Sequence, residues 1–163
     1  MRQIEDVMDT HFEAITWGLG ELHFFKRGDE ALRKTIETHA GRQVAGFMAW
    51  LEGELGDNHW FGGHEFGRGD LSVVPYLNAA DAFGFRPAEG SPLAAWIGRA
   101  NARDSVSKTD AESRASIAGM QMVSAAVESG LFKRQYRDHR LEWMIKSGGM
   151  EVVRDGLEKQ TIR

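Results

Sequence analysis

The sequence predicts an all-α fold. Apolar residues recur every three or four positions along almost all of the 163-residue chain, as on the buried face of a helix. No segment alternates apolar and polar residues in the manner of a half-buried strand. With 42% hydrophobic and 27% charged residues, the composition is that of a folded globular protein. We therefore expect a single all-helical domain over 1–163.

The N-terminal part of the chain predicts two long helices, the first over about 1–25 and the second over about 28–55. One face of the first helix carries the apolar residues Ile4, Met8, Phe12, Ile15, Leu19 and Leu22. Gly28-Asp29 interrupts the pattern and caps the second helix. A loop rich in glycine and aromatic residues then continues to Phe66.

A third helix is expected from Gly67 to about residue 82. Asp70 falls at its N3 position, so its carboxylate can reach back to the Gly67 N–H, which is half of a capping box. Phe66 before the cap and Leu71 at position N4 have the spacing of a hydrophobic staple. Gly67 and Asp70 are therefore interpreted as structural capping residues in preference to catalytic ones.

The rest of the chain carries further helix signals. Ser91-Pro92 reads as an N-cap followed by N1 and predicts a short helix that contains Trp96. Thr109 with Glu112 forms a capping box for a longer helix, which Gly130 can end. The later helices are expected over 109–129, 136–147 and 151–159.

Charge and composition exclude several classes of protein. A net charge of −4 argues against a nucleic-acid partner, and the basic cluster Lys133–Arg137 is interpreted as a solvated helix face. The absence of cysteine excludes disulfides and thiolate chemistry. No apolar run approaches the ~20 residues of a membrane span, and the N-terminus lacks a signal-peptide core. We therefore expect no membrane association and a cytoplasmic location.

Two sequence segments carry a resemblance to a known family. Phe66, Gly67 and Asp70 match an aromatic-Gly-capping motif, with glycine in place of a usual hydroxyl residue. The segment SPLAAWIGRANARDSV, with Trp96 followed by Arg99 and Arg103, resembles a segment written p-x-L-x-x-W-x-x-R. Together with the two preceding long helices, these segments resemble the C-terminal helical domain of glutathione S-transferases. The similarity covers residues 1 to about 106, and the tail YRDHRLEWMIKSGG resembles a bacterial subgroup. The implied fold is a glutathione S-transferase C-terminal-like bundle of about six or seven helices.

The resemblance implies a hydrophobic substrate site and dimer contacts that serve glutathione conjugation. In this family glutathione is the co-substrate, and a thioredoxin-like domain, which we do not find in this chain, holds it and activates its sulfur. The expected partners are a hydrophobic small molecule and either a second copy of the chain or such a domain, with no cofactor on this chain. Two alternatives stay open: a free-standing interaction or dimerisation module, and a glutathione-independent enzyme on the same fold.

The first helix supplies the candidate binding residues. Glu13, Trp17 and Phe24 fall together, roughly opposite the apolar face. In the resembled family this helix lines the hydrophobic substrate site, which makes these three residues candidate substrate contacts. The alternative is that Trp17 and Phe24 pack on a neighbouring helix of the same domain.

Catalytic and metal-binding signals are sparse. His11 is expected on the apolar side of the first helix, and His11 with Glu13 would be the candidate catalytic pair of a glutathione-independent enzyme. His59, His64 and Glu65 match no compact metal-binding spacing, so no metal site is expected.

Overall fold

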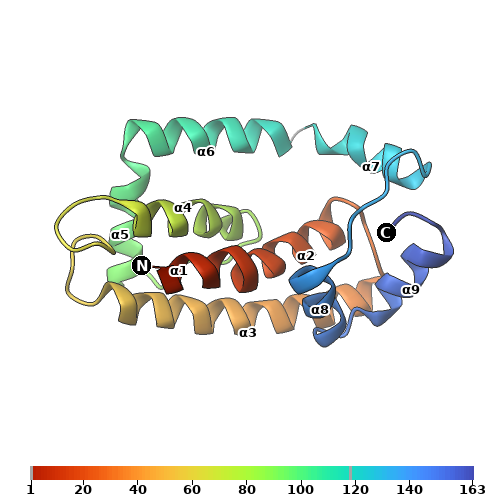
Figure 1. Ribbon diagram of the computed structural model, residues 1–163, viewed down its shortest axis with the longest axis horizontal. Helices are drawn as coiled ribbons and strands as arrows, with labels where there is room; N and C mark the ends of the chain where they lie inside the picture. Colours follow the sequence, from red (N-terminus) through yellow and green to blue (C-terminus); the bar gives the residue numbers. More distant parts are fainter. Residues whose placement is uncertain (1, 118) are drawn as a thin grey trace. The chain divides into compact units, whose positions relative to one another are not determined.

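The computed structural model describes residues 2–117 and 119–163, and all regular structure in these two ranges is helical (Figure 1). Extended pairing within them is limited to isolated bridges, between Trp60 and Gly63 and between Arg134 and Ile162. The all-α prediction is therefore confirmed. Across the same residues no helix has the length and apolar character needed to cross a bilayer. Two of the expected helices, over 1–25 and 109–129, include positions outside the described residues, Met1 and Ala118.

The helices follow one another in chain order, with a π-helical turn, η1, between the first two. They are α1 (Arg2–Val7), η1 (Met8–Phe12), α2 (Glu13–His23), α3 (Glu30–Leu55), α4 (Arg68–Asp81), α5 (Pro92–Asn101), α6 (Asp104–Ile117), α7 (Met120–Glu128), α8 (Asp138–Lys146) and α9 (Met150–Glu158). Because α1, η1 and α2 follow without interruption, they form the single long helix expected at the N-terminus, and all six residues of its predicted apolar face are buried.

Several predicted helix ends are confirmed by their hydrogen bonds. The Asp29 carboxylate accepts a hydrogen bond from the Leu32 N–H at 2.8 Å and caps α3. The Ser91 hydroxyl accepts one from the Ala94 N–H at 3.1 Å and caps α5. Gly130 follows α7 with a φ of 76°, a left-handed conformation that glycine adopts without a steric penalty.

Three predicted features of the C-terminal half are wrong. Helix α6 already begins at Asp104, whose negative charge in the first turn interacts favourably with the positive end of the helix dipole. Thr109 and Glu112 therefore lie inside the helix and form no cap. The helix expected over 109–129 is divided into α6 and α7, with Gly119, a poor helix former, preceding α7. Tyr136 lies in an extended segment before α8, because residues 134 and 136 pair with the C-terminal residues.

The chain divides into two compact units, whose boundaries fall within helices. One comprises the described residues up to Glu13 together with Gly41–Ser113, and the other comprises Ala14–Ala40 and Arg114–Arg163. In the first unit, α4 contacts both α1 and η1, and α5 contacts α4 (Figure 1). The expectation of one domain over 1–163 stays a prediction.

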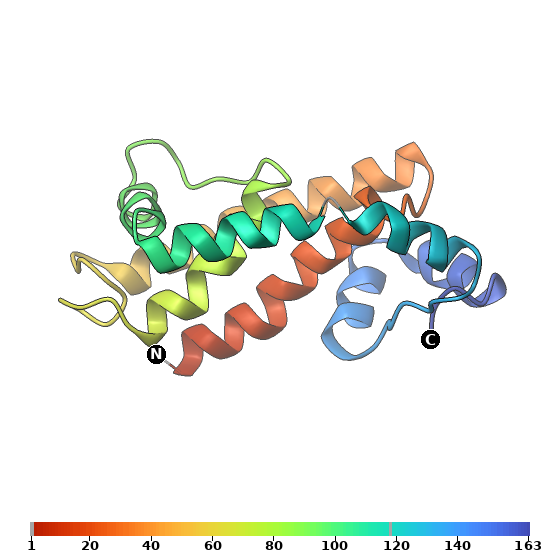
Figure 2. The same ribbon diagram turned by 90° about the horizontal axis from the view of Figure 1, so that it is seen from above.

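The second unit is held together by a close helix contact and by the returning C-terminus. A Cβ atom on Gly18 of α2 would overlap with Cζ3 of Trp143 on α8, so this approach requires glycine. The extended segment between α7 and α8 runs beside the last residues of the chain (Figure 2). There the Arg134 N–H donates to the Thr161 carbonyl at 2.9 Å, and the Tyr136 N–H donates to the Arg163 carbonyl at 2.8 Å.

Candidate functional site

The predicted binding face of the first helix is half-buried. Glu13 is the first residue of α2, Trp17 follows one turn later, and Phe24 lies directly after the helix end. His11, in contrast, is exposed, and the prediction that it lies on the apolar side is wrong. It lies in the π-helical turn η1. The role of Glu13, Trp17 and Phe24 in ligand binding stays a prediction.

Trp17 has a cationic and aromatic environment in the second unit. Its ring meets the ring of Tyr136 edge to face, with centroids 4.8 Å apart. The guanidinium carbons of Arg134 and Arg140 lie 5.8 Å and 5.3 Å from its centroid, within cation–π range. These contacts support the alternative interpretation, in which Trp17 packs within its own domain.

A buried carboxylate on α2, Glu21, lies at the centre of this unit and is 0% exposed. Its Oε2 accepts hydrogen bonds from Arg27 Nε at 3.1 Å and from the Tyr136 hydroxyl at 2.9 Å. Its Oε1 accepts one from Arg134 Nε at 2.6 Å. Arg27 Nη1 in turn donates to the Thr161 hydroxyl at 3.0 Å. These contacts connect α2 to two segments that are distant in sequence.

Sequence reasoning missed this polar centre. The available signal was a glutamate inside the apolar run Leu19–Phe25, since a charge on an otherwise buried helix face needs partners. The interpretation of Lys133–Arg137 as a solvated helix face is wrong for Arg134, whose side chain is 20% exposed and pairs with Glu21. Because this segment is extended, Arg134 and Tyr136 point to the same side and reach the same carboxylate.

Burial, followed by the charge of Glu21, raises the pKa of the Tyr136 phenol well above its usual range. The unfolded chain therefore releases this proton first, so the stabilisation from Tyr136 is complete below about pH 10 and is lost progressively as the pH rises above it. We expect Tyr136→Phe to lower the free energy of unfolding by about 1–2 kcal/mol at pH 7, and this difference to shrink above about pH 10. Urea unfolding between pH 7 and 11 would measure it.

The other tyrosine, Tyr76, offers a matched control. Its hydroxyl donates to Asp9 at 2.7 Å in an exposed setting, so Tyr76→Phe keeps the same ring and loses a bond that water can replace. A stability difference between wild type and Tyr136→Phe that stays constant from pH 7 to 11 would contradict the prediction.

Asp70 forms a second buried polar centre, in the first unit, and it too is 0% exposed. Its Oδ2 accepts the Gly67 N–H at 2.9 Å, which confirms the predicted half of the capping box. Its Oδ1 accepts the Phe61 N–H at 3.1 Å and the Trp96 indole N–H at 2.7 Å. The carboxylate therefore joins the loop, α4 and α5.

Two arginines of the segment SPLAAWIGRANARDSV contact the same loop, which lies between α3 and α4. Arg99 donates to the His59 carbonyl at 2.9 Å, and the guanidinium of Arg103 lies 4.2 Å from the ring centroid of Phe66. The expected staple partner of Phe66, Leu71, is 57% exposed, whereas Phe66 packs edge-on against Trp60.

In the part of the chain that the structure describes, no three His, Asp or Glu side chains gather into a potential metal site.

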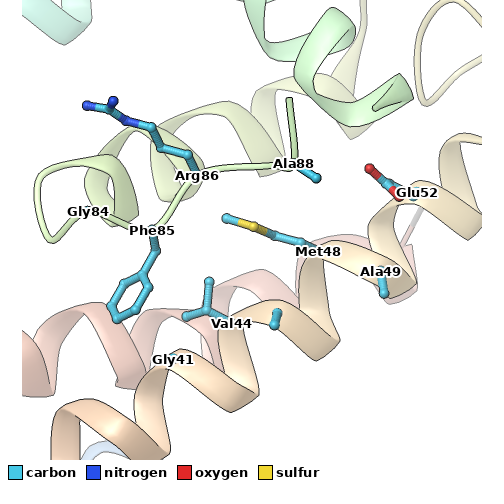
Figure 3. Close-up of a pocket in the computed structure, with 10 residues that line it drawn as sticks. Gly41, Val44, Met48, Ala49, Glu52, Gly84, Phe85, Arg86 and Ala88 are labelled. Atoms are coloured by element: carbon cyan, nitrogen blue, oxygen red, sulfur yellow. The ribbon is translucent and has the colours of Figure 1, made fainter. Parts of the chain in front are cut away.

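An open groove of about 390 Å³ lies in the first unit, between α3 and the loop that follows α4. Helix α3 contributes Gly41, Val44, Ala45, Met48, Ala49 and Glu52 to its lining, and the loop contributes Gly84, Phe85, Arg86 and Ala88. We call this cavity the α3 groove. In Figure 3 the Phe85 ring points from the loop towards α3, whereas Met48 points from α3 towards the loop. A Cβ atom on Gly41 would lie 3.2 Å from Phe85 Cε1, so glycine makes room for this ring.

The charges of the α3 groove come from Arg86 and Glu52. Figure 3 shows the Arg86 guanidinium directed away from α3, and it forms an ion pair with Asp81. Glu52 lies at the end of the groove opposite Phe85 (Figure 3). The cavity is thus an apolar trough with one acidic end, and sequence reasoning did not find it because its two walls lie more than 30 positions apart.

The chain is similar in sequence to a known plant protein. The chain is 40% identical over 85 residues to a protein of Oryza sativa subsp. indica named "Probable glutathione S-transferase GSTU1". The match takes in 47% of this chain and 37% of the rice protein. No family model and no solved structure matches. The similarity supports a glutathione S-transferase-like relationship, and the all-helical fold is consistent with a C-terminal-like helical domain of that kind.

Proposed function

We propose that this chain is the helical, hydrophobic-ligand-binding part of a glutathione S-transferase-like protein. In the whole protein it would hold an electrophilic small molecule that is conjugated to glutathione. A thioredoxin-like domain would bind glutathione and activate its sulfur. No residue of the present chain is proposed to perform that activation.

The α3 groove is the observation that carries this proposal. Its volume of about 390 Å³ falls within the range of roughly 300–1,000 Å³ that is usual for small-molecule sites. Val44, Met48 and Phe85 give it apolar walls, and transfer of an apolar ligand from water into such a site is favourable. The similarity to the rice protein supports the transferase class, and the groove supports the part that this chain plays in it.

Blocking the groove is the first test. Ala49 is an exposed helical residue that lines it, so Ala49→Trp should fill part of the cavity and leave the fold intact. We expect this variant to bind the neutral fluorescent probe N-phenyl-1-naphthylamine about tenfold more weakly than wild type does, or worse. Fluorescence titration of the purified chain would measure the change.

Ala79→Trp is the matched control, since Ala79 is also an exposed helical alanine but lies outside the groove. It should bind the probe as wild type does. If Trp17→Ala abolishes probe binding and Ala49→Trp does not, the ligand site is the predicted face of the first helix and the groove assignment is wrong.

Titration calorimetry with glutathione tests the proposed division of labour. We expect no saturable binding to this chain, because the proposal assigns glutathione to a thioredoxin-like domain. Saturable binding would mean that the helical chain has a glutathione site of its own, and would overturn that assignment.

A further inference from the structure

The apolar walls of the α3 groove define the body of the ligand it can take. Phe85 closes one end with an aromatic ring, and Val44 and Met48 continue the wall along α3 (Figure 3). Met48 is an unbranched, polarisable side chain that adapts to the shape of a neighbour. A narrow body with an aromatic ring therefore fits the trough.

The opposite end of the groove is acidic. Within the described residues no hydrogen bond or ion pair reaches the half-buried carboxylate of Glu52, whereas the nearest basic lining residue, Arg86, is paired with Asp81. Exposed Glu89, next to the lining residue Ala88, adds a further negative charge to this region. The electrostatic potential at this end therefore favours a positively charged group.

The geometry points to a ligand with an apolar, ring-containing body and a cationic head, such as an aryl-alkyl ammonium compound, with the cation facing Glu52. This inference rests on the proposed function, because it assumes that the α3 groove is the ligand site and adds the chemical class of the ligand. Glu52 is then the residue that determines specificity by charge, and the apolar walls provide affinity without regard to charge.

Three competitors with the same phenylbutyl body isolate the effect of charge: 4-phenylbutylamine, 4-phenylbutanol and 4-phenylbutyrate. Each is used to displace N-phenyl-1-naphthylamine from the purified chain. We expect the amine to displace the probe at about fivefold lower concentration than the alcohol, because it gains an ion pair at a half-buried site. The carboxylate should be the weakest competitor of the three. Raising the salt concentration to about 1 M should reduce the preference, since salt screens such a pair.

Glu52→Gln removes the charge and keeps the shape of the side chain, so the amine and the alcohol should become equal competitors. Glu54→Gln is the matched control, because Glu54 is an exposed residue of the same helix outside the groove, and it should keep the preference. Equal displacement by amine and alcohol in wild type, or a preference that persists in Glu52→Gln, would overturn the inference alone. Probe binding that Ala49→Trp leaves unchanged would overturn the proposed function as well.

Discussion

Glu21→Gln is expected to lower the free energy of unfolding by about 3–5 kcal/mol, the usual cost of removing one partner from a buried charge network. Two guanidinium groups and a tyrosine hydroxyl converge on this carboxylate, which is 0% exposed. Arg27 Nη2 is already buried with no hydrogen-bond partner in the described part of the chain. A neutral amide would leave the guanidinium groups of Arg27 and Arg134, which are 9% and 20% exposed, without this counter-charge. Urea unfolding followed by circular dichroism at pH 7 would measure the loss.

Two further variants separate charge pairing from other causes. Glu151→Gln makes the same substitution at a residue that is 69% exposed and lies 3.7 Å from Arg154, and it should cost less than about 1 kcal/mol. Replacing Glu21, Arg27 and Arg134 together by leucine and methionine should recover most of the stability, because no unpaired charge then stays buried. A triple variant that is less stable than Glu21→Gln would contradict this account.

Asp70→Asn is the second change with a large expected effect, a destabilisation of about 3 kcal/mol. The carboxylate accepts hydrogen bonds from three N–H groups, those of Gly67, Phe61 and the Trp96 indole. An amide has one acceptor oxygen in place of two, so its NH₂ group must face at least one of these donors. The cost combines the loss of charge-assisted bonds with unsatisfied buried groups.

Asp29→Asn provides the control, because Asp29 also caps a helix but does so in an exposed setting, where asparagine caps about equally well. It should change stability by less than about 0.5 kcal/mol. The indole N–H signal of Trp96 in a heteronuclear NMR spectrum gives an independent readout and should shift in Asp70→Asn. An unshifted signal with unchanged stability would show that the three bonds contribute nothing to the fold.

Local sequence signals predicted most of the fold. The buried face of the first helix, the caps at Asp29 and Ser91 and the Asp70–Gly67 bond all involve residues within a few positions of one another, so spacing alone reveals them. Errors arose where a local signal competed with another one. The capping box at Thr109 is outweighed by an earlier helix start.

The sequence by itself determined the all-helical class, the apolar helix faces and the capping role of Asp70, because each depends on interactions within one or two turns. Only the tertiary structure decided which distant residues meet. The side chains of Arg134 and Tyr136 bind Glu21, which lies 113 and 115 positions earlier in the sequence. The α3 groove forms where the ring of Phe85 packs close to Gly41. Side-chain periodicity specifies which face of a helix is buried, but not which partner covers it. The partner is fixed by packing and by the need of each buried charge for a counter-charge.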